Sequence, residues 1–277
     1  MAAGYNEEMK KRLGLALGGG SALGNAHLGV LQCFHDRAIP IDCIAGTSAG
    51  AVVAACYAFG VSIETMRTTA EKLSWRSISK FSPSKLGIIS NEALAGVVKG
   101  LIGGDHRIED ARMPLAIVAA DISTGEKVVY RSGSVLQAVR ASAAIPIVFT
   151  PVVIGNDLLV DGGLLENVPM SPLVSMGADV RVGVNLSRWM PKKIPGNILD
   201  IMDRSISIMS RYTIPPLENE VMIEPHLEEY ASSDFQKGQE LADHGYRAAA
   251  HKIAEIEKLL GEKRGTVLQR LERWLRE

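Results

Sequence analysis

The stretch Gly46-Thr47-Ser48-Ala49-Gly50 stands between an apolar run, residues 41–45, and a run of small apolar residues, 49–59. The first run predicts a strand, and the second predicts a helix that packs closely on a sheet. A G-x-S-x-G pentapeptide between a strand and a helix is the context of a nucleophile elbow, whose glycines permit a tight turn that exposes the serine hydroxyl. The positive end of the following helix dipole favours negative charge developing at Ser48. An ordinary turn serine is the alternative interpretation of the pentapeptide.

A second glycine-rich turn, Gly18-Gly19-Gly20-Ser21-Ala22-Leu23-Gly24, follows the apolar run 13–17 and precedes a helical pattern over 26–38. Consecutive glycines let backbone N–H groups point at an anion, either a nucleotide phosphate or the oxyanion of an acyl-transfer intermediate. A P-loop would need Gly-Lys-Ser/Thr, which is absent, whereas Asp42 lies close to the separation that a dinucleotide loop requires. The elbow one strand away favours an oxyanion hole, and a purely structural turn stays open.

A third motif, Asp161-Gly162-Gly163, comes directly after the apolar strand pattern 158–160. An acidic side chain at the carboxyl end of a strand in a parallel α/β sheet points to the ligand crevice. Asp-Gly is also common in turns, so the motif is weak by itself. No histidine has a local motif beside Ser48, and only two predicted strands precede that serine, which disfavours an ordinary α/β-hydrolase triad. The histidines are His27, His35, His106, His226, His244 and His251.

The order strand, helix, strand, helix over the first 59 residues predicts a mostly parallel sheet covered by helices. Further strands are expected over residues 115–120, 127–131, 152–154, 158–160, 180–185 and 221–224. Further helices are expected over residues 63–73, 92–101, 135–142, 197–212, 235–260 and 266–277, with a turn-rich segment over 75–90. No linker is long enough to require a separate folding unit.

Composition narrows the function classes. The chain has 277 residues and a net charge of −1, which argues against a surface that binds nucleic acid. Its three cysteines, Cys33, Cys43 and Cys56, form no C-x-x-C pair, which fits a reducing cytoplasm without disulfides. No secretory leader and no membrane-spanning stretch is readable. No cluster of His, Cys, Asp or Glu has metal-ligand spacing, so neither a metal nor a cofactor is expected.

Taken together, the three motifs resemble the patatin-like phospholipase family, and they stand in that family's order. A fourth block agrees with it, Arg140-Ala141-Ser142-Ala143-Ala144-Ile145-Pro146, followed by Phe149 and Pro151. The resemblance runs from roughly Leu13 to Ala250 and is nearest in kind to bacterial single-domain members. It implies a three-layer α/β/α fold with a mostly parallel central sheet. The expected division is a tail over 1–12, a catalytic domain over 13–250 and a helical extension over 251–277.

The resemblance also implies a chemistry: hydrolysis of lipid acyl esters, of phospholipase or lysophospholipase type, through an acyl-enzyme. It assigns the nucleophile to Ser48 and the base to Asp161, with no metal or cofactor. The backbone N–H groups of the oxyanion hole are expected at Gly18, Gly19, Gly20 and Ser21. The glycines expected to shape the turns are Gly24, Gly46, Gly50, Gly162 and Gly163.

One position departs from the family pattern. Family members usually carry Arg or Lys just before the last glycine of the loop, where this chain has Leu23, and that basic residue is thought to brace the loop. Independently of Leu23, two enzymatic alternatives are an acyltransferase and a general carboxylesterase on the same fold. A third alternative, of another class, is a catalytically weak lipid-binding or regulatory protein.

The end of the chain carries a separate hypothesis about membranes. The expected helix over 266–277 has one apolar face flanked by positive charge, which suits a helix lying at a lipid surface. The apolar residues are Val267, Leu268, Leu271, Trp274 and Leu275, and the basic ones are Lys263, Arg264, Arg270, Arg273 and Arg276. Packing on its own domain or on a partner copy is the more ordinary interpretation of the same pattern. The expected location is the cytoplasm, with this helix as the means of peripheral contact with the inner membrane face.

Overall fold

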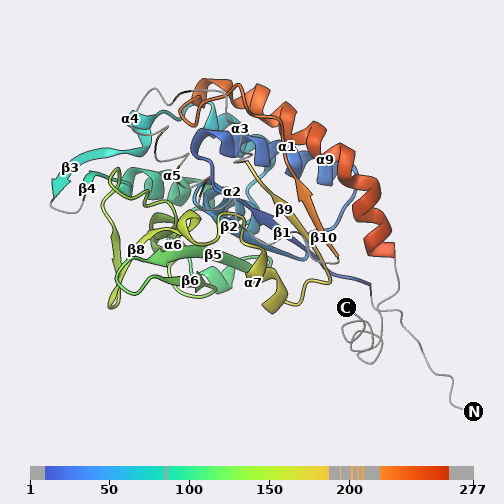
Figure 1. Ribbon diagram of the computed structural model, residues 1–277, viewed down its shortest axis with the longest axis horizontal. Helices are drawn as coiled ribbons and strands as arrows, with labels where there is room; N and C mark the ends of the chain where they lie inside the picture. The colour runs from blue at the N-terminus through green and yellow to red at the C-terminus, as the bar shows by residue number, and fades with distance from the viewer. Residues whose placement is uncertain are drawn as a thin grey trace, which may run out of the picture.

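The centre of the protein is a mixed, mostly parallel β-sheet (Figure 1). The computed structural model describes residues 10–84, 87–186 and 219–261, together with the single positions 194, 201, 205 and 208. Within these residues the strand order is β10-β9-β1-β2-β5-β8-β7, and β6 also pairs with β5. The strands are β1 (Leu13–Leu17), β2 (Cys43–Thr47), β5 (Leu115–Asp121), β6 (Glu126–Tyr130), β7 (Val152–Ile154), β8 (Asp157–Asp161), β9 (Val180–Val184) and β10 (Glu220–Ile223).

Strands β10, β9, β1, β2 and β5 are parallel to one another, and β6, β7 and β8 pair antiparallel. Large side chains of the parallel strands, such as Leu15 and Ile44, face the main core, whereas small ones, such as Ala16 and Ala45, face the opposite side. The helices are α1 (Asn25–Asp36), α2 (Ala49–Ala58), α3 (Ile63–Ala70), α4 (Trp75–Ile78), α5 (Glu92–Ile102), α6 (Val135–Ser142), α7 (Met170–Ser175) and α9 (Gly238–Gly261).

Helices cover both faces of the sheet, which confirms the three-layer architecture. Leu31 of α1, Ala54 of α2 and Leu241 of α9 belong to the main core on one face. The other face is closed by the short helix α7, whose Leu173 packs against Ala16 and Ala45. Figure 1 shows α7 on the side of the sheet opposite to α1 and α9. The small side chains on that face allow a short helix to approach the strands closely.

Helices α1 and α9 lie side by side along the sheet and cross with their backbones in contact (Figure 1). A Cβ atom added to Gly29 would lie 1.8 Å from the carbonyl oxygen of Ala242, and one added to Gly245 would lie 1.9 Å from that of Ala26. Helix α9 continues without a break through the domain boundary expected at 250/251, and its Ile256 is buried in the main core.

The turn-rich segment expected over 75–90 forms regular structure instead. It contains α4 and a two-stranded antiparallel sheet of β3 (Lys80–Ser84) and β4 (Gly87–Ser90), which extends from the body of the protein (Figure 1). Pro83 within β3 hid this strand, because proline is depleted in strand patterns. Ile89 of β4 forms a bridge with Phe149.

Two expected helices lie outside the described residues: the one over 266–277 entirely, and the one over 197–212 apart from three single positions. The proposed membrane contact of the chain's end therefore has no structural counterpart here. Within the described part of the chain, no helix combines the length and the apolar character needed to cross a membrane.

The crossing of α1 and α9 predicts which glycines resist substitution. Gly29→Ala and Gly245→Ala force the two helices apart, and overpacking of this kind costs about 1–3 kcal/mol. In a chain of this size that lowers Tm by several degrees, at about 2–4 °C per kcal/mol. The matched control is Gly96→Ala in α5, where nothing lies within 4 Å of the added Cβ, so that Tm stays equal or rises. Thermal unfolding followed by circular dichroism measures the three; equal Tm values for Gly29→Ala and Gly96→Ala contradict the prediction.

Candidate functional site

Ser48 occupies a strained turn between β2 and α2. Its backbone angles are φ 53° and ψ −122°, a left-handed conformation that is uncommon for residues other than glycine. Such strain persists where the surroundings enforce it and is concentrated at functional sites. Here the enforcement is steric: a Cβ on Gly50 would lie 2.0 Å from the Leu17 carbonyl oxygen, and one on Gly46 would lie 2.5 Å from that of Gly50. The turn can therefore form only with glycine at both positions.

Asp161 ends a strand, β8, whose direction the sequence did not indicate. Strand β8 is antiparallel to β5, so the expectation that Asp161 ends a parallel strand is wrong. Strand β6 pairs with β5 over Ile117–Asp121, so β2 and β8 share the other edge of β5, one after the other. Thr47 is paired with Val118 and Asp161 with Ala119. The carboxyl ends of β2 and β8 thus meet head-on, one residue step of about 3.4 Å apart along β5.

The turn after β8 fixes the aspartate locally. Asp161 is 2% exposed, and its Oδ1 accepts a hydrogen bond of 2.8 Å from the amide of Gly163. Gly162 lies against β5, where an added Cβ would be 2.3 Å from the Val118 carbonyl oxygen. Both glycines of the motif are thereby explained: one provides a donor to the carboxylate, and the other allows the close approach to β5.

Ser142, the last residue of α6, connects the two segments, a role that no sequence motif indicates. Its Oγ donates to the Val118 carbonyl at 2.5 Å and accepts from the amide of Ser48 at 2.8 Å. Two residues further on, the Ala144 carbonyl accepts from the amide of Asp161 at 2.9 Å. A fully buried serine on a helix whose neighbours are apolar is the signal that could have indicated this contact.

The four residues expected to form an oxyanion hole divide into two pairs. The Gly18 amide donates to the Val184 carbonyl at 3.0 Å, and the Gly19 amide donates to both oxygens of Asn167 at 3.2 Å. Within the residues that the structure describes, the amides of Gly20 and Ser21 have no acceptor. Ser21 itself has a left-handed φ of 52°. Two amides of the loop are thus engaged inside the protein, whereas those of Gly20, which is buried, and Ser21, which lines the pocket beside Ser48, donate to no described residue.

The remaining motif residues serve the packing of the loop. Gly24 rests on the start of α2, with an added Cβ 2.9 Å from the Cβ of Ala49. Leu23 is 5% exposed and belongs to the main core, so a basic side chain here would meet apolar surroundings.

His27 is fully buried, and its Nε2 lies 2.8 Å from the Gly18 carbonyl oxygen. Burial lowers the pKa of His27 to about 4, against the opposing effect of this hydrogen bond.

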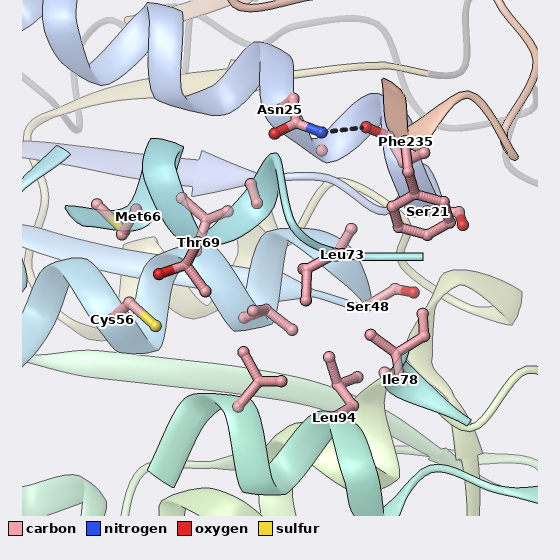
Figure 2. A pocket seen from close by; sticks show the side chains of 18 of the residues that line it. Ser21, Asn25, Ser48, Cys56, Met66, Thr69, Leu73, Ile78, Leu94 and Phe235 are labelled. Atoms are coloured by element: carbon pink, nitrogen blue, oxygen red, sulfur yellow. Dashed lines mark hydrogen bonds between the residues drawn. The ribbon is translucent and has the colours of Figure 1, made fainter. Parts of the chain in front are cut away.

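An apolar pocket of about 130 Å³ opens beside Ser48. Figure 2 shows Ser48 at one end, near Phe235 and Ile78, whereas Cys56, Met66 and Thr69 lie at the other. The side chains come mainly from α2, α3, α5 and the segment after α6, and none is Lys, Arg, Asp, Glu or His. Burial raises the pKa of the Cys56 thiol to about 12, which keeps it neutral. In the described part of the chain, no group of three His, Cys, Asp or Glu could hold a metal ion.

The buried His27 predicts a specific dependence of stability on pH. Its pKa of about 4 in the folded state lies below the ordinary 6.5, so the unfolded state binds more protons between these values. Stability is therefore complete above pH 6.5 and falls as the pH drops towards 4, by about 2 kcal/mol between pH 7 and pH 5. Urea unfolding at several pH values should show a smaller loss for His27→Gln, which retains a donor and does not titrate. Equal losses in both proteins over this range would refute the assignment.

Comparison with known proteins gives a consistent result. Residues 15–174 match the family model described as patatin-like phospholipase. An uncharacterized NTE family protein of Mycobacterium tuberculosis is 37% identical over 179 residues, which cover 64% of this chain and 49% of that protein. The lysophospholipase NTE1 of Phaeosphaeria nodorum is 26% identical over 89% of this chain and 18% of its own length. The chain thus spans half or less of each of these relatives.

Solved structures with the same fold share little sequence. VipD from Legionella pneumophila superposes with a TM-score of 0.52 and 15% identity, over 91% of this chain and 67% of that one. The type III effector protein ExoU gives a TM-score of 0.51 and 13% identity, over 92% of this chain and 54% of that one. Since the family model covers more than half of its residues, the chain belongs to the patatin-like phospholipase family.

Proposed function

We propose that this protein is a serine hydrolase that cleaves acyl esters of lipids, with Ser48 as nucleophile and Asp161 as base. The observation that carries the proposal is the strained, glycine-enforced turn that presents Ser48 at the end of an apolar pocket. The head-on meeting of β2 and β8 supports Asp161 as its partner. The lipid class rests on the family and on relatives such as the lysophospholipase NTE1.

The reaction follows from these positions. Ser48 Oγ attacks the ester carbonyl carbon while its proton passes to the Asp161 carboxylate, and the carbonyl oxygen becomes the oxyanion. The amides of Gly20 and Ser21, which have no acceptor among the described residues, are the donors proposed to stabilise it. Asp161 returns the proton to the departing alcohol, which leaves an acyl-enzyme. Water then attacks the acyl carbon, giving its proton to Asp161, and the fatty acid departs as that proton returns to Ser48.

The pocket supports an orientation for the substrate, with the acyl chain inside and the alcohol portion outside. Its lining is apolar away from Ser48, and each methylene buried there contributes about 0.8 kcal/mol. A volume of about 130 Å³ is close to that of an engineered cavity of ~150 Å³ that holds benzene, so it accepts roughly six carbons. The polar head group of a lipid finds no charged partner among the lining residues and is placed towards solvent.

Two substitutions test the dyad directly. Ser48→Ala and Asp161→Asn should each lower kcat for p-nitrophenyl esters by about 10³-fold or more, and the double variant should lose little beyond either single one because the groups act as a unit. Asp157→Asn, at the opposite end of β8, is the matched control and should stay within two-fold of the wild type, roughly the scatter expected for surface positions.

Labelling by a fluorophosphonate separates the alternatives. Modification of Ser48 in the wild type but not in Ser48→Ala supports a hydrolase, whereas absence of labelling in a folded protein favours a lipid-binding role. A hydrolase forms free fatty acid by transferring the acyl group to water, whereas an acyltransferase forms a new ester with an added alcohol. Analysis of the products therefore distinguishes the two. Full activity of Asp161→Asn would remove the aspartate from the mechanism.

Filling the far end of the pocket should change chain-length preference. Thr69→Phe shortens the pocket, so kcat/KM for dodecanoyl esters should fall at least about ten-fold, since each excluded methylene forfeits ~0.8 kcal/mol. Butyryl esters should be affected little. Thr68→Phe on the exposed side of α3 is the matched control. The measurement is kcat/KM over p-nitrophenyl esters of increasing length, and an unaltered profile in Thr69→Phe argues against this pocket as the acyl site.

A further inference from the structure

The peptide unit that joins Gly18 to Gly19 is held from both sides by buried side chains. Its carbonyl oxygen, on Gly18, lies 2.8 Å from Nε2 of His27. Its N–H, on Gly19, donates to Oδ1 of Asn167 and to the Asn167 carbonyl, each at 3.2 Å. Because a peptide unit is planar, fixing both groups fixes the orientation of the whole plane.

The chemistry of the peptide unit settles the orientation of both side chains. A carbonyl oxygen only accepts, so Nε2 of His27 carries the hydrogen, and Nδ1 is the unprotonated nitrogen of the neutral ring. An amide N–H only donates, so the side-chain oxygen of Asn167 must face Gly19 and its Nδ2 must point away. His27 is fully buried and Asn167 is 5% exposed, so that protein atoms surround both side chains.

Both side chains carry a polar atom that burial leaves without compensation. Nδ1 of His27 and Nδ2 of Asn167 are buried and have no hydrogen-bond partner among the described residues. Burying an unpaired polar atom opposes folding, and an apolar side chain of similar volume would avoid that cost. The contribution that distinguishes His27 and Asn167 from such side chains is therefore the pair of contacts with the Gly18–Gly19 peptide.

This peptide lies against the nucleophile. A Cβ added to Gly19 would be 2.7 Å from Oδ1 of Asn167 and 3.1 Å from the Cβ of Ser48. The residue before Asn167 binds the elbow itself, since Thr47 Oγ1 donates to the Glu166 carbonyl at 3.0 Å. One short segment after β8 thus sets the glycine-rich loop and the serine turn relative to each other.

We propose that His27 and Asn167 are positioning residues, which clamp the Gly18–Gly19 peptide and thereby aim the amides of Gly20 and Ser21 at the oxyanion formed on Ser48. This role rests on the proposed function. Rotation of the clamped peptide would turn the two amides that follow it, so the clamp acts on the transition state and hardly on the pocket that binds the acyl chain. It also supplies, from neutral groups, a brace for a loop in which Leu23 occupies the position of the usual basic residue.

The test compares variants that keep or remove each hydrogen bond. His27→Phe retains a buried ring without the donor, and Asn167→Leu retains volume without the acceptor. Each should lower kcat for p-nitrophenyl butyrate by about 10- to 100-fold, below the ~10²–10³ lost with an oxyanion donor itself, with KM within about two-fold. His27→Gln supplies a side-chain N–H and should recover most of the activity. The control Leu31→Ala, buried in α1 away from the pocket, should lower Tm and leave kcat unchanged.

Amide hydrogen exchange provides a readout that needs no activity. The clamp predicts slow exchange of the Gly19 amide in the wild type and faster exchange in His27→Phe and Asn167→Leu, measured by NMR on folded protein. If Ser48→Ala remains as active as the wild type, the proposed function fails while the exchange data still decide the clamp. Unchanged exchange with unchanged kcat in a folded His27→Phe overturns the clamp, and so does an equal loss of activity in His27→Gln and His27→Phe.

Discussion

The contact on which the site depends is between the start of helix α2 and the end of strand β1. A side chain on Gly50 would overlap the carbonyl oxygen of Leu17 and lie 2.7 Å from that of Gly18. The serine turn therefore rests directly on the first residue of the glycine-rich loop. Any residue larger than glycine at position 50 would separate the two turns. Close backbone packing, rather than a side-chain interaction, brings the Ser48 turn and the glycine-rich loop together.

The antiparallel part of the sheet makes the end of β8 face the end of β2 on the same edge of β5. In an all-parallel sheet, adjacent carboxyl ends are separated by the strand spacing of about 4.8 Å and point the same way. Here β5 extends beyond the end of β2, and β8 pairs with the protruding part from the opposite direction. Two chain segments therefore end facing each other on one edge of β5. The arrangement permits a short aspartate side chain to approach a serine that stands on a tight turn.

The sequence was sufficient for those parts of the site that are encoded locally. The pentapeptide around Ser48 and the glycines from Gly18 to Gly20 have a spacing that predicts their turns, and the parallel strands follow from short apolar runs. Asp161 stands out by its position after an apolar run and by the family resemblance of the Asp-Gly-Gly motif, although β8 is antiparallel to β5 and not parallel as expected. Strand direction depends on pairing with β5, and the residues of β8 alone contain no information about it.

Contacts between distant segments were beyond prediction for the same reason. Ser142 lies 94 positions from Ser48, and Asn167 lies 148 positions from Gly19. At such separations no sequence spacing predicts the hydrogen bond within either pair. His27 lies in α1 between the apolar residues Ala26 and Leu28, and its partner is the backbone carbonyl of Gly18, a contact that no sequence motif marks. A single buried polar residue on an apolar face is better interpreted as a partner for backbone groups, which greatly outnumber catalytic ones.

The pocket lining and the two buried titratable side chains near it, those of His27 and Cys56, share one electrical property: they carry no charge. The pocket lining has no charged residue type, His27 is held neutral by burial, and the Cys56 thiol is neutral as well. In such surroundings the effective dielectric constant is low, and a fixed backbone dipole interacts more strongly with a new charge than it would in water. An oxyanion that forms at Ser48 meets no competing positive side chain in the pocket, so its stabilisation depends on how accurately the nearby amides are held. Beside an uncharged pocket, an oxyanion gains from rigid hydrogen bonds that are remote from the reacting atoms, and the proposed clamp by His27 and Asn167 would provide them.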